Sequence, residues 1–281
     1  MEKTAQKKKK KAVSLITHLF LICLAVVVLL PFVYIVLISF GRGVTSVSTV
    51  IPSSFTTRNY SQLFTETKYL SWMGNSVLVA AGTMTVAVII VFTSSYVLSR
   101  MRFCGRHKLF SGILLLQVFP LVLSMVSLFK IFVAIGFLNK LSSLIIVNSV
   151  FSSAGLILVA KGYFDAIPHS LDEAAKVDGA SRMTILLRVI FPLALPILSF
   201  IAIQSFVISY NEYAVASAIM SEGVDTLPLA VGLQSMLHGQ FGQNWSLYCA
   251  GAVLGSIPMI VLFYSLQKYF IGDLLAGGVK E

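Results

Sequence analysis

Six apolar runs recur along this chain of 281 residues, and each is long enough to cross about 30 Å of hydrocarbon as a helix. They cover residues 13–39, 75–99, 109–132, 141–164, 191–217 and 245–270. Only 11% of the residues are charged, and the mean hydropathy is +0.89. The first run is too long for a signal peptide, so we expect it to remain as a span. Because lipid leaves backbone polar groups no other partners, the sequence predicts an all-α membrane protein with six transmembrane helices in one domain, residues 13–270.

The net charge of +10 is unevenly distributed along the chain. In a six-span layout, sixteen of the 21 Lys and Arg residues fall on one side, many of them in the basic N-terminus, residues 1–12. By the positive-inside rule, both termini, the segment 165–190 and the tail 271–281 are cytoplasmic, and the loops 40–74 and 218–244 face outward. This pattern indicates a lipid bilayer rather than nucleic acid as the partner, and the N-terminal lysines could also touch anionic head groups.

The outward side carries two further features. Residues 59–64 could begin a short interfacial helix in the first outer loop. Trp72 and Trp245 fall where spans should meet the outer interface, which is the usual place for indole rings.

A polar helix-turn-helix interrupts the apolar chain between the fourth and fifth runs. Ser170 and Glu173 have the spacing of a capping box that starts a short helix. Ala174 and Ala175 leave one face of that helix nearly bare, and Gly179 can take the left-handed conformation that ends it. Such a helix predicts a docking element that enters a groove on another protein.

The sequence lacks the residue patterns of a catalytic or metal site. There is no phosphate-binding loop of the Gly-x-x-x-x-Gly-Lys-Ser/Thr type, so we expect no nucleotide to be bound by this chain. No pair of carboxylates is placed for acid–base chemistry, and the three cysteines are most simply apolar fillers. The four histidines are scattered over different segments: His18, His107, His169 and His238. We therefore expect a non-enzymatic chain without a metal or other cofactor.

Polar residues within the spans are a second candidate site, because such residues are costly in lipid. The candidates for lining a translocation pathway are Gln117, Asn148, Gln204, Tyr210, Asn211 and Glu212. For Gln117 and Asn148, hydrogen bonding between helices is an equal alternative. Glu212 favours a functional role, since a lone carboxylate in a span needs water or a partner. Tyr210 could stack on a sugar ring or lie at the interface as an aromatic anchor.

The helix-turn-helix also carries a family resemblance. Glu173-Ala-Ala-x-x-x-Gly179, followed by Ile-Phe-Pro-Leu at 190–193, resembles the cytoplasmic EAA loop of membrane subunits of binding-protein-dependent ABC importers. Further segments are similar to the carbohydrate branch of that family and to its maltose/maltodextrin-type permeases: 116–124, 161–164, 211–213, 226–233 and 267–280. The resemblance implies the type I ABC importer permease fold.

The resemblance also implies partners. A second permease subunit completes the pathway, two copies of a separate cytoplasmic ATPase bind MgATP, and an extracytoplasmic solute-binding protein delivers a sugar. It assigns coupling to the ATPase to Leu171, Glu173, Ala174, Ala175, Asp178, Gly179 and Arg182. It assigns tail contacts with the ATPase to Ala276, Gly277, Gly278 and Lys280. The chain departs from the family pattern at Asp273 and Leu275 in the tail, and at Tyr210, where Trp is common.

Three alternatives remain open from the sequence. The solute could be glycerol phosphate or a different oligosaccharide. A secondary transporter driven by an ion gradient would want charged residues deep in several spans, where this chain offers only Glu212. A membrane anchor for a cytoplasmic complex would need no succession of polar residues within its spans.

Overall fold

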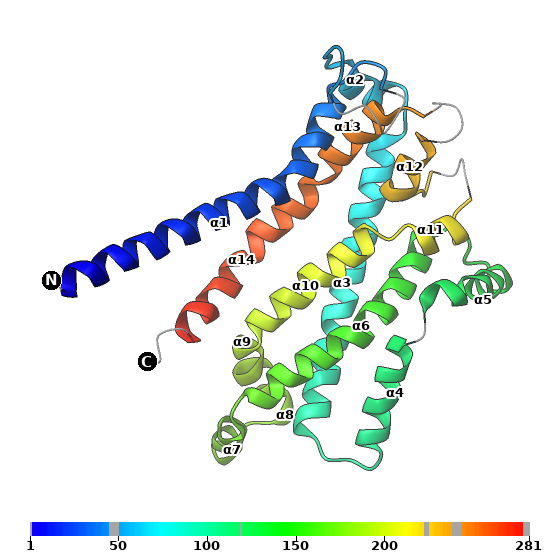
Figure 1. Ribbon diagram of the computed structural model, residues 1–281. Coiled ribbons are helices and arrows are strands. Elements are labelled where there is room, and N and C mark those ends of the chain that lie inside the picture. The colour runs from blue at the N-terminus through cyan, green and yellow to red at the C-terminus, as the bar shows by residue number, and fades with distance from the viewer. Residues whose placement is uncertain (1, 45–50, 119, 222–224, 238–242, 278–281) are drawn as a thin grey trace. The chain divides into compact units, whose positions relative to one another are not determined.

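Helices make up every regular element that the structure, a computed structural model, describes; it covers residues 2–44, 51–118, 120–221, 225–237 and 243–277 (Figure 1). The helices are α1 (Glu2–Ser39), α2 (Arg58–Thr65), α3 (Tyr69–Arg100), α4 (Arg106–Val118), α5 (Leu121–Ala134), α6 (Leu141–Ala166), α7 (His169–Val177), α8 (Arg182–Thr184), the π-helix η1 (Ile185–Ile190), α9 (Phe191–Leu193), α10 (Leu195–Tyr210), α11 (Ala214–Ile219), α12 (Leu229–Ser235), α13 (Trp245–Gly255) and α14 (Ile257–Gly277). The chain divides into two compact units, 1–67 with 233–254, and 68–232 with 255–281.

Four stretches of helix in the described residues are long and apolar enough to cross a membrane. They are Ser14–Ser39, Tyr69–Arg100, Leu141–Ala166 and Trp245–Tyr269. Two bent helix pairs raise this number to as many as six when each pair is one span. The chain is therefore a multi-pass helical membrane protein, with four to six spans.

The third and fifth apolar runs are each interrupted by a sharp bend, as the prolines within them lead us to expect. In the third run, Arg106–Val118 and Leu123–Ala134 meet at 102°, and in the fifth, Arg182–Leu193 and Leu195–Tyr210 meet at 77°. Both breaks lie at prolines, Pro120 in one case and Pro192 with Pro196 in the other. Proline has no N–H for the helix ladder and crowds the preceding turn, so a bend at these places is expected.

The first unit is organised around the end of α1. The side-chain amide of Asn59 donates to the carbonyl oxygens of Ser39 at 2.7 Å and Gly41 at 2.9 Å, which fixes α2 against this end. An isolated antiparallel bridge joins Gly41 to Phe55, and the Trp245 N–H donates to the Val44 carbonyl at 3.1 Å. The helix expected near residues 59–64 is confirmed as α2.

The core of the second unit lies where α3, α6 and α10 run side by side (Figure 1). Its apolar residues come from all three helices and from the bend that precedes α10. A buried polar chain crosses this core, because Asn148 donates to the Ser209 hydroxyl and Ser209 donates to the Thr83 hydroxyl, each at 3.0 Å. These bonds join α6, α10 and α3. For Asn148 they confirm the alternative of hydrogen bonding between helices.

Trp72 makes a contact that the sequence did not predict. Its side chain is 6% exposed and packs against the backbone of α12 at Gly232. A Cβ atom built on Gly232 would lie 2.2 Å from the indole Cδ2, which is far too close. Glycine at position 232 is therefore what allows the indole ring to close over α12.

Replacing Gly232 with Ala should destabilise this packing by about 1–3 kcal/mol, because the new methyl group must displace a rigid buried ring. We expect a lower midpoint in thermal unfolding of the purified protein. Gly162→Ala is the matched control: it lies in α6, its Cβ would meet nothing within 4 Å, and Ala is the better helix former. An unchanged midpoint in Gly232→Ala would contradict this account of the contact.

Candidate functional site

The polar segment between α6 and η1 folds as a short helix with a defined end. We call residues 168–182 the docking segment. Asp178 is the C-cap residue of α7, and Gly179 follows it with a φ of +79°. The N–H of Gly179 donates to Lys176 O at 3.0 Å, and the N–H of Ala180 donates to Ala175 O at 2.9 Å. This pair of bonds is a Schellman motif, so the left-handed end expected at Gly179 is confirmed.

The start of α7 differs from the predicted capping box. The N-cap is Pro168, with no side-chain capping bond, and Ser170 lies inside the first turn. The carbonyl of Pro168 already accepts from the Leu171 N–H at 3.4 Å, so the helix begins two residues earlier than the Ser170 pattern suggested. Side-chain capping occurs instead at Ser181, whose hydroxyl accepts from the Thr184 N–H at 3.2 Å.

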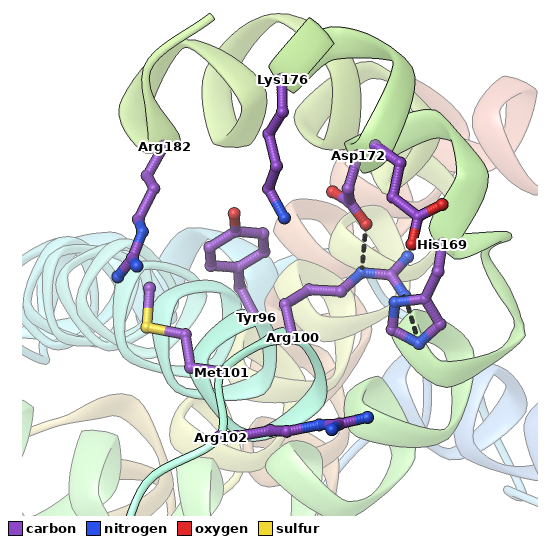
Figure 2. Close-up of a pocket in the computed structure, with 9 residues that line it drawn as sticks. Tyr96, Arg100, Met101, Arg102, His169, Asp172, Lys176 and Arg182 are labelled. Carbon is purple, nitrogen blue, oxygen red and sulfur yellow. Dashed lines mark hydrogen bonds and ion pairs between the residues drawn. The ribbon is translucent and has the colours of Figure 1, made fainter.

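Arg100, the last residue of α3, contacts Asp172 and His169 at the start of the docking segment (Figure 2), and its third nitrogen atom binds the residue just before the segment. Its Nε lies 3.0 Å from Asp172 Oδ2 in an ion pair that lacks hydrogen-bond alignment. Nη1 lies 3.0 Å from His169 Nδ1, and Nη2 donates to the Ile167 carbonyl at 2.8 Å. Because a guanidinium only donates, the imidazole nitrogen that it meets is an acceptor.

The ion pair is buried, which is unusual for charged groups. The side chains of Arg100 and Asp172 are 5% and 8% exposed. Burial of a carboxylate is costly unless a nearby opposite charge offsets it, and Arg100 supplies that charge. Asp172 also lies in the first turn of α7, where the helix dipole favours a negative side chain.

A cavity of about 210 Å³ opens beside this ion pair (Figure 2). Its lining is mainly charged and comes from the end of α3 and from the docking segment: Tyr96, Arg100, Met101, Arg102, His169, Asp172, Glu173, Lys176 and Arg182. Glu173 and Arg182, both predicted coupling residues, therefore border one cavity. Sequence reasoning missed Arg100 and Asp172. The signal available was weak, since Arg100 was counted only as a topology charge and Asp172 stands beside the more familiar Glu173.

The docking segment exposes apolar side chains to solvent, next to the exposed charged residues Glu173, Lys176 and Asp178. Val177 is 88% exposed and Leu171 is 39% exposed, while Met183 in the turn that follows is 62% exposed. Ala174 is exposed as well, whereas Ala175 is half-buried and packs on the protein's own core. The expectation that both alanines form one bare outer face is therefore wrong for Ala175, because adjacent helical residues point about 100° apart.

A firmly packed elbow connects the docking segment to the membrane helices. The π-helix η1 follows α8, and its residues Ile185, Leu186 and Ile190 are 1%, 9% and 0% exposed within the core shared with α3 and α6. Pro192 cannot supply the N–H that the Arg188 carbonyl would need in an α-helix, which fits the wider winding of η1. The elbow is thus a rigid continuation of the core, ending at the 77° bend.

A second cavity, of about 520 Å³, lies among α4, α6 and α10. Four of the predicted pathway residues line it: Gln117, Asn148, Gln204 and Glu212. Gly155 gives Gln117 its space, since a Cβ atom there would lie 2.1 Å from Gln117 Nε2. The remaining lining is largely apolar and includes Phe151 and Phe200.

Two predicted pathway residues lie elsewhere. Tyr210 is buried, and its hydroxyl donates to the Gly255 carbonyl at 2.8 Å. Asn211 is exposed and donates to the Val207 carbonyl at 3.0 Å at the end of α10. The structure therefore brings together four of the six predicted pathway residues and separates these two from the cavity.

Glu212 lies between α10 and α11, just after the end of the span, and its carboxylate has partners there. Its Oε1 accepts from the Val215 N–H at 2.7 Å, and its Oε2 accepts from the Ala216 N–H at 2.9 Å. Both oxygens are thus occupied by two of the free amides in the first turn of α11. The carboxylate shapes the end of the cavity, and its charge is stabilised within the chain itself.

The predicted tail contacts fall at the limit of the described chain. Ala276 and Gly277 are the last two residues of α14, and Gly278 and Lys280 lie outside the described residues.

Comparison with known proteins supplies the family. The model of the family described as "Binding-protein-dependent transport system inner membrane component" matches residues 99–274. The maltodextrin transport system permease protein MdxG of Bacillus subtilis is 33% identical, with 94% of this chain and 95% of that protein covered. The galactooligosaccharides transport system permease protein GanQ of the same organism is 34% identical, with 95% of each covered.

Similarity extends to an enterobacterial relative and to a solved structure. The maltose/maltodextrin transport system permease protein MalG of Escherichia coli K12 is 33% identical, with 98% of each chain covered. A chain in the crystal structure of a bacterial ABC transporter involved in the import of the acidic polysaccharide alginate has a TM-score of 0.74 and 23% identity, covering 92% of this chain and 97% of that one. That match shows a shared fold. This chain belongs to the inner membrane component family of binding-protein-dependent transport systems.

Proposed function

We propose that this chain is the permease subunit of an ATP-driven importer that takes up a sugar or oligosaccharide, of the maltodextrin type, from a solute-binding protein. The names of its relatives refer to maltodextrin, galactooligosaccharide and maltose/maltodextrin transport. The observation that carries the proposal is the docking segment. It presents an apolar face to a partner, while its base is held by a buried ion pair at the end of a membrane helix.

The partners in this proposal supply what this non-catalytic chain lacks. A second permease subunit completes the pathway, and two copies of a cytoplasmic ATPase carry MgATP and bind the docking segment and the tail. A soluble protein outside the cell delivers the solute. A solved relative of the same fold, with a TM-score of 0.68, comes from an alginate transporter in complex with its oligosaccharide-bound periplasmic protein, which supports this arrangement.

The proposed topology places the chain in the bacterial plasma membrane with both termini in the cytoplasm. Each bent helix pair then counts as one span, which gives six. The basic residues 1–12, the segment 165–190 and the tail 271–281 face the ATPase side, and the loops 40–74 and 218–244 face the binding protein. The charge asymmetry of the sequence supports this orientation.

The cavity of about 520 Å³ is the proposed contribution of this chain to the pathway. The amides of Gln117 and Gln204 can donate and accept hydrogen bonds, as sugar hydroxyls require. Phe151 and Phe200 offer rings on which the apolar face of a sugar can rest. Glu212 lies at this cavity with both oxygens occupied by backbone amides, which speaks against a role as a free proton or cation carrier.

Reconstitution of the complete transporter into liposomes tests the proposal. With MgATP inside and the binding protein outside, we expect uptake of radiolabelled maltotriose that stops when ATP is replaced by ADP. Competition by unlabelled galactooligosaccharide tests the nearest other solute. Uptake that survives the loss of ATP but collapses with the proton gradient would indicate a secondary transporter instead.

A further inference from the structure

Arg100 and the docking segment are far apart along the chain. Between them lie α4, α5 and α6, so the covalent path from the end of α3 to α7 crosses most of three helices. The link between α3 and the start of α7 is therefore made by side chains. Among the described contacts, Arg100 makes that link with Ile167, His169 and Asp172, which are all within six residues of one another.

The chemistry of these contacts requires arginine. A guanidinium directs donors in a fixed planar fork, and here its three nitrogen atoms address a carbonyl, an imidazole and a carboxylate. A lysine would carry the charge but could not hold three partners in this geometry. Asp172 in turn depends on Arg100. Both of its carboxylate oxygens are buried and make no hydrogen bond within the described residues, so the ion pair with Arg100 is what offsets their charge.

We propose that the Arg100–Asp172 ion pair is the positioning link through which movement of the docking segment is transmitted to α3. The elbow of η1 joins the other end of the segment to the same core, so the segment is held at both ends. A force on its exposed apolar face then moves α3, α6 and the start of α10 together. Without the ion pair, the segment still presents Leu171 and Val177 to a partner, but its start is held only by the short connection to α6 and by the Arg100 contacts with Ile167 and His169.

The inference rests on the proposed function for its transport consequence, so the first measurement is independent of transport. Spin labels on native Cys104, which is exposed in the loop after α3, and on Ser170→Cys in α7 report the distance across the link. Cys23, also exposed, is replaced by Ser in all chains. In the assembled transporter, we expect a narrow distance distribution for the parent and a broader one for Asp172→Asn and for Arg100→Lys.

The second measurement is the amount of maltotriose taken up per ATP hydrolysed, with co-purification of the ATPase as a measure of assembly. Asp172→Asn and Arg100→Lys should keep the ATPase bound but lower uptake per ATP by about tenfold, as expected when a coupling free energy between two sites is lost. Asp172→Glu, which retains the charge, should stay within about twofold of the parent.

Lys161→Met is the matched control. It removes an ion pair at the same end of the membrane helices, since Lys161 Nζ lies 2.5 Å from Asp165 Oδ2, but both of these residues belong to α6. Neither the label distance nor uptake per ATP should change in this variant.

Two results would overturn the inference: an unchanged distance distribution in Asp172→Asn, or a broadened distribution with normal uptake per ATP. If the parent transporter takes up no maltotriose, the proposed solute is wrong, and hydrolysis stimulated by the binding protein then replaces uptake as the coupling measure. In either case, the spin-label distance tests whether the Arg100–Asp172 ion pair holds α7 against α3.

Discussion

Glu173→Lys is expected to reduce ATP-dependent uptake by about 100-fold while the chain remains in the membrane, because reversing a charge at a docked interface costs about 2–5 kcal/mol. Glu173 is exposed beside Asp172 on the docking segment, and α7 itself does not need its carboxylate for capping. The substitution therefore acts on the partner and leaves the fold intact. The measurement is uptake into proteoliposomes together with the ATPase recovered on the purified permease.

Glu66→Lys serves as the control for this charge change, since Glu66 is equally exposed but follows α2 in the other unit of the chain. It should leave the recovery of the ATPase on the purified permease unaltered, because Glu66 lies in the loop 40–74, on the opposite side of the proposed topology. Normal uptake in Glu173→Lys would contradict the docking role of the segment.

Gly179→Val is the second substitution with a large expected effect. Position 179 has a φ of +79°, a conformation that a β-branched residue adopts only at a cost of about 1–3 kcal/mol. To avoid that strain, α7 must lose its Schellman end, which redirects the apolar face that the docking segment presents. We expect an uptake loss of at least about tenfold, because about 1.4 kcal/mol already corresponds to that factor.

Two further substitutions distinguish the effect of the backbone conformation at position 179 from the effect of a larger side chain. Gly179→Asn should retain most of the uptake, since asparagine tolerates the left-handed region. Gly162→Val places the same valine in α6, in a position where no atom lies within 4 Å of the new Cβ, and should have little effect. If Gly179→Asn and Gly179→Val fail equally, the backbone conformation of the turn is not the cause.

The features that were predictable from the sequence are those encoded over short stretches. Apolar run length predicted the spans, the proline positions predicted where two of them bend, and Gly179 predicted the end of α7. The family also followed from a local pattern around Glu173. Each of these depends on residues close together in the chain, where spacing and backbone preference carry the information.

The features that were missed depend on contacts between distant segments. The Arg100–Asp172 pair joins positions 72 residues apart, and no local pattern distinguishes Arg100 from the other basic residues near it. The packing of Trp72 on Gly232, which provides the space for the indole ring, also joins positions far apart in the chain. Ser170 had the right spacing for a capping box, but the chain already turns at Pro168. Long-range packing explains the first two cases, whereas the start of α7 depends on a neighbouring proline that outweighed the capping pattern.

The pairing of Glu212 with the amides of α11 has an electrical consequence. Glu212 has both carboxylate oxygens occupied by backbone amides, and the other polar groups described in the cavity lining are uncharged amides and hydroxyls. A neutral solute that passes such a lining carries no charge through the membrane field, where each elementary charge would be worth about 2.3 kcal/mol per 100 mV. In the proposed function, the membrane voltage therefore neither drives nor opposes the passage of this solute. The free energy for its accumulation would come from ATP hydrolysed on the partner subunits and would reach this chain through the docking segment.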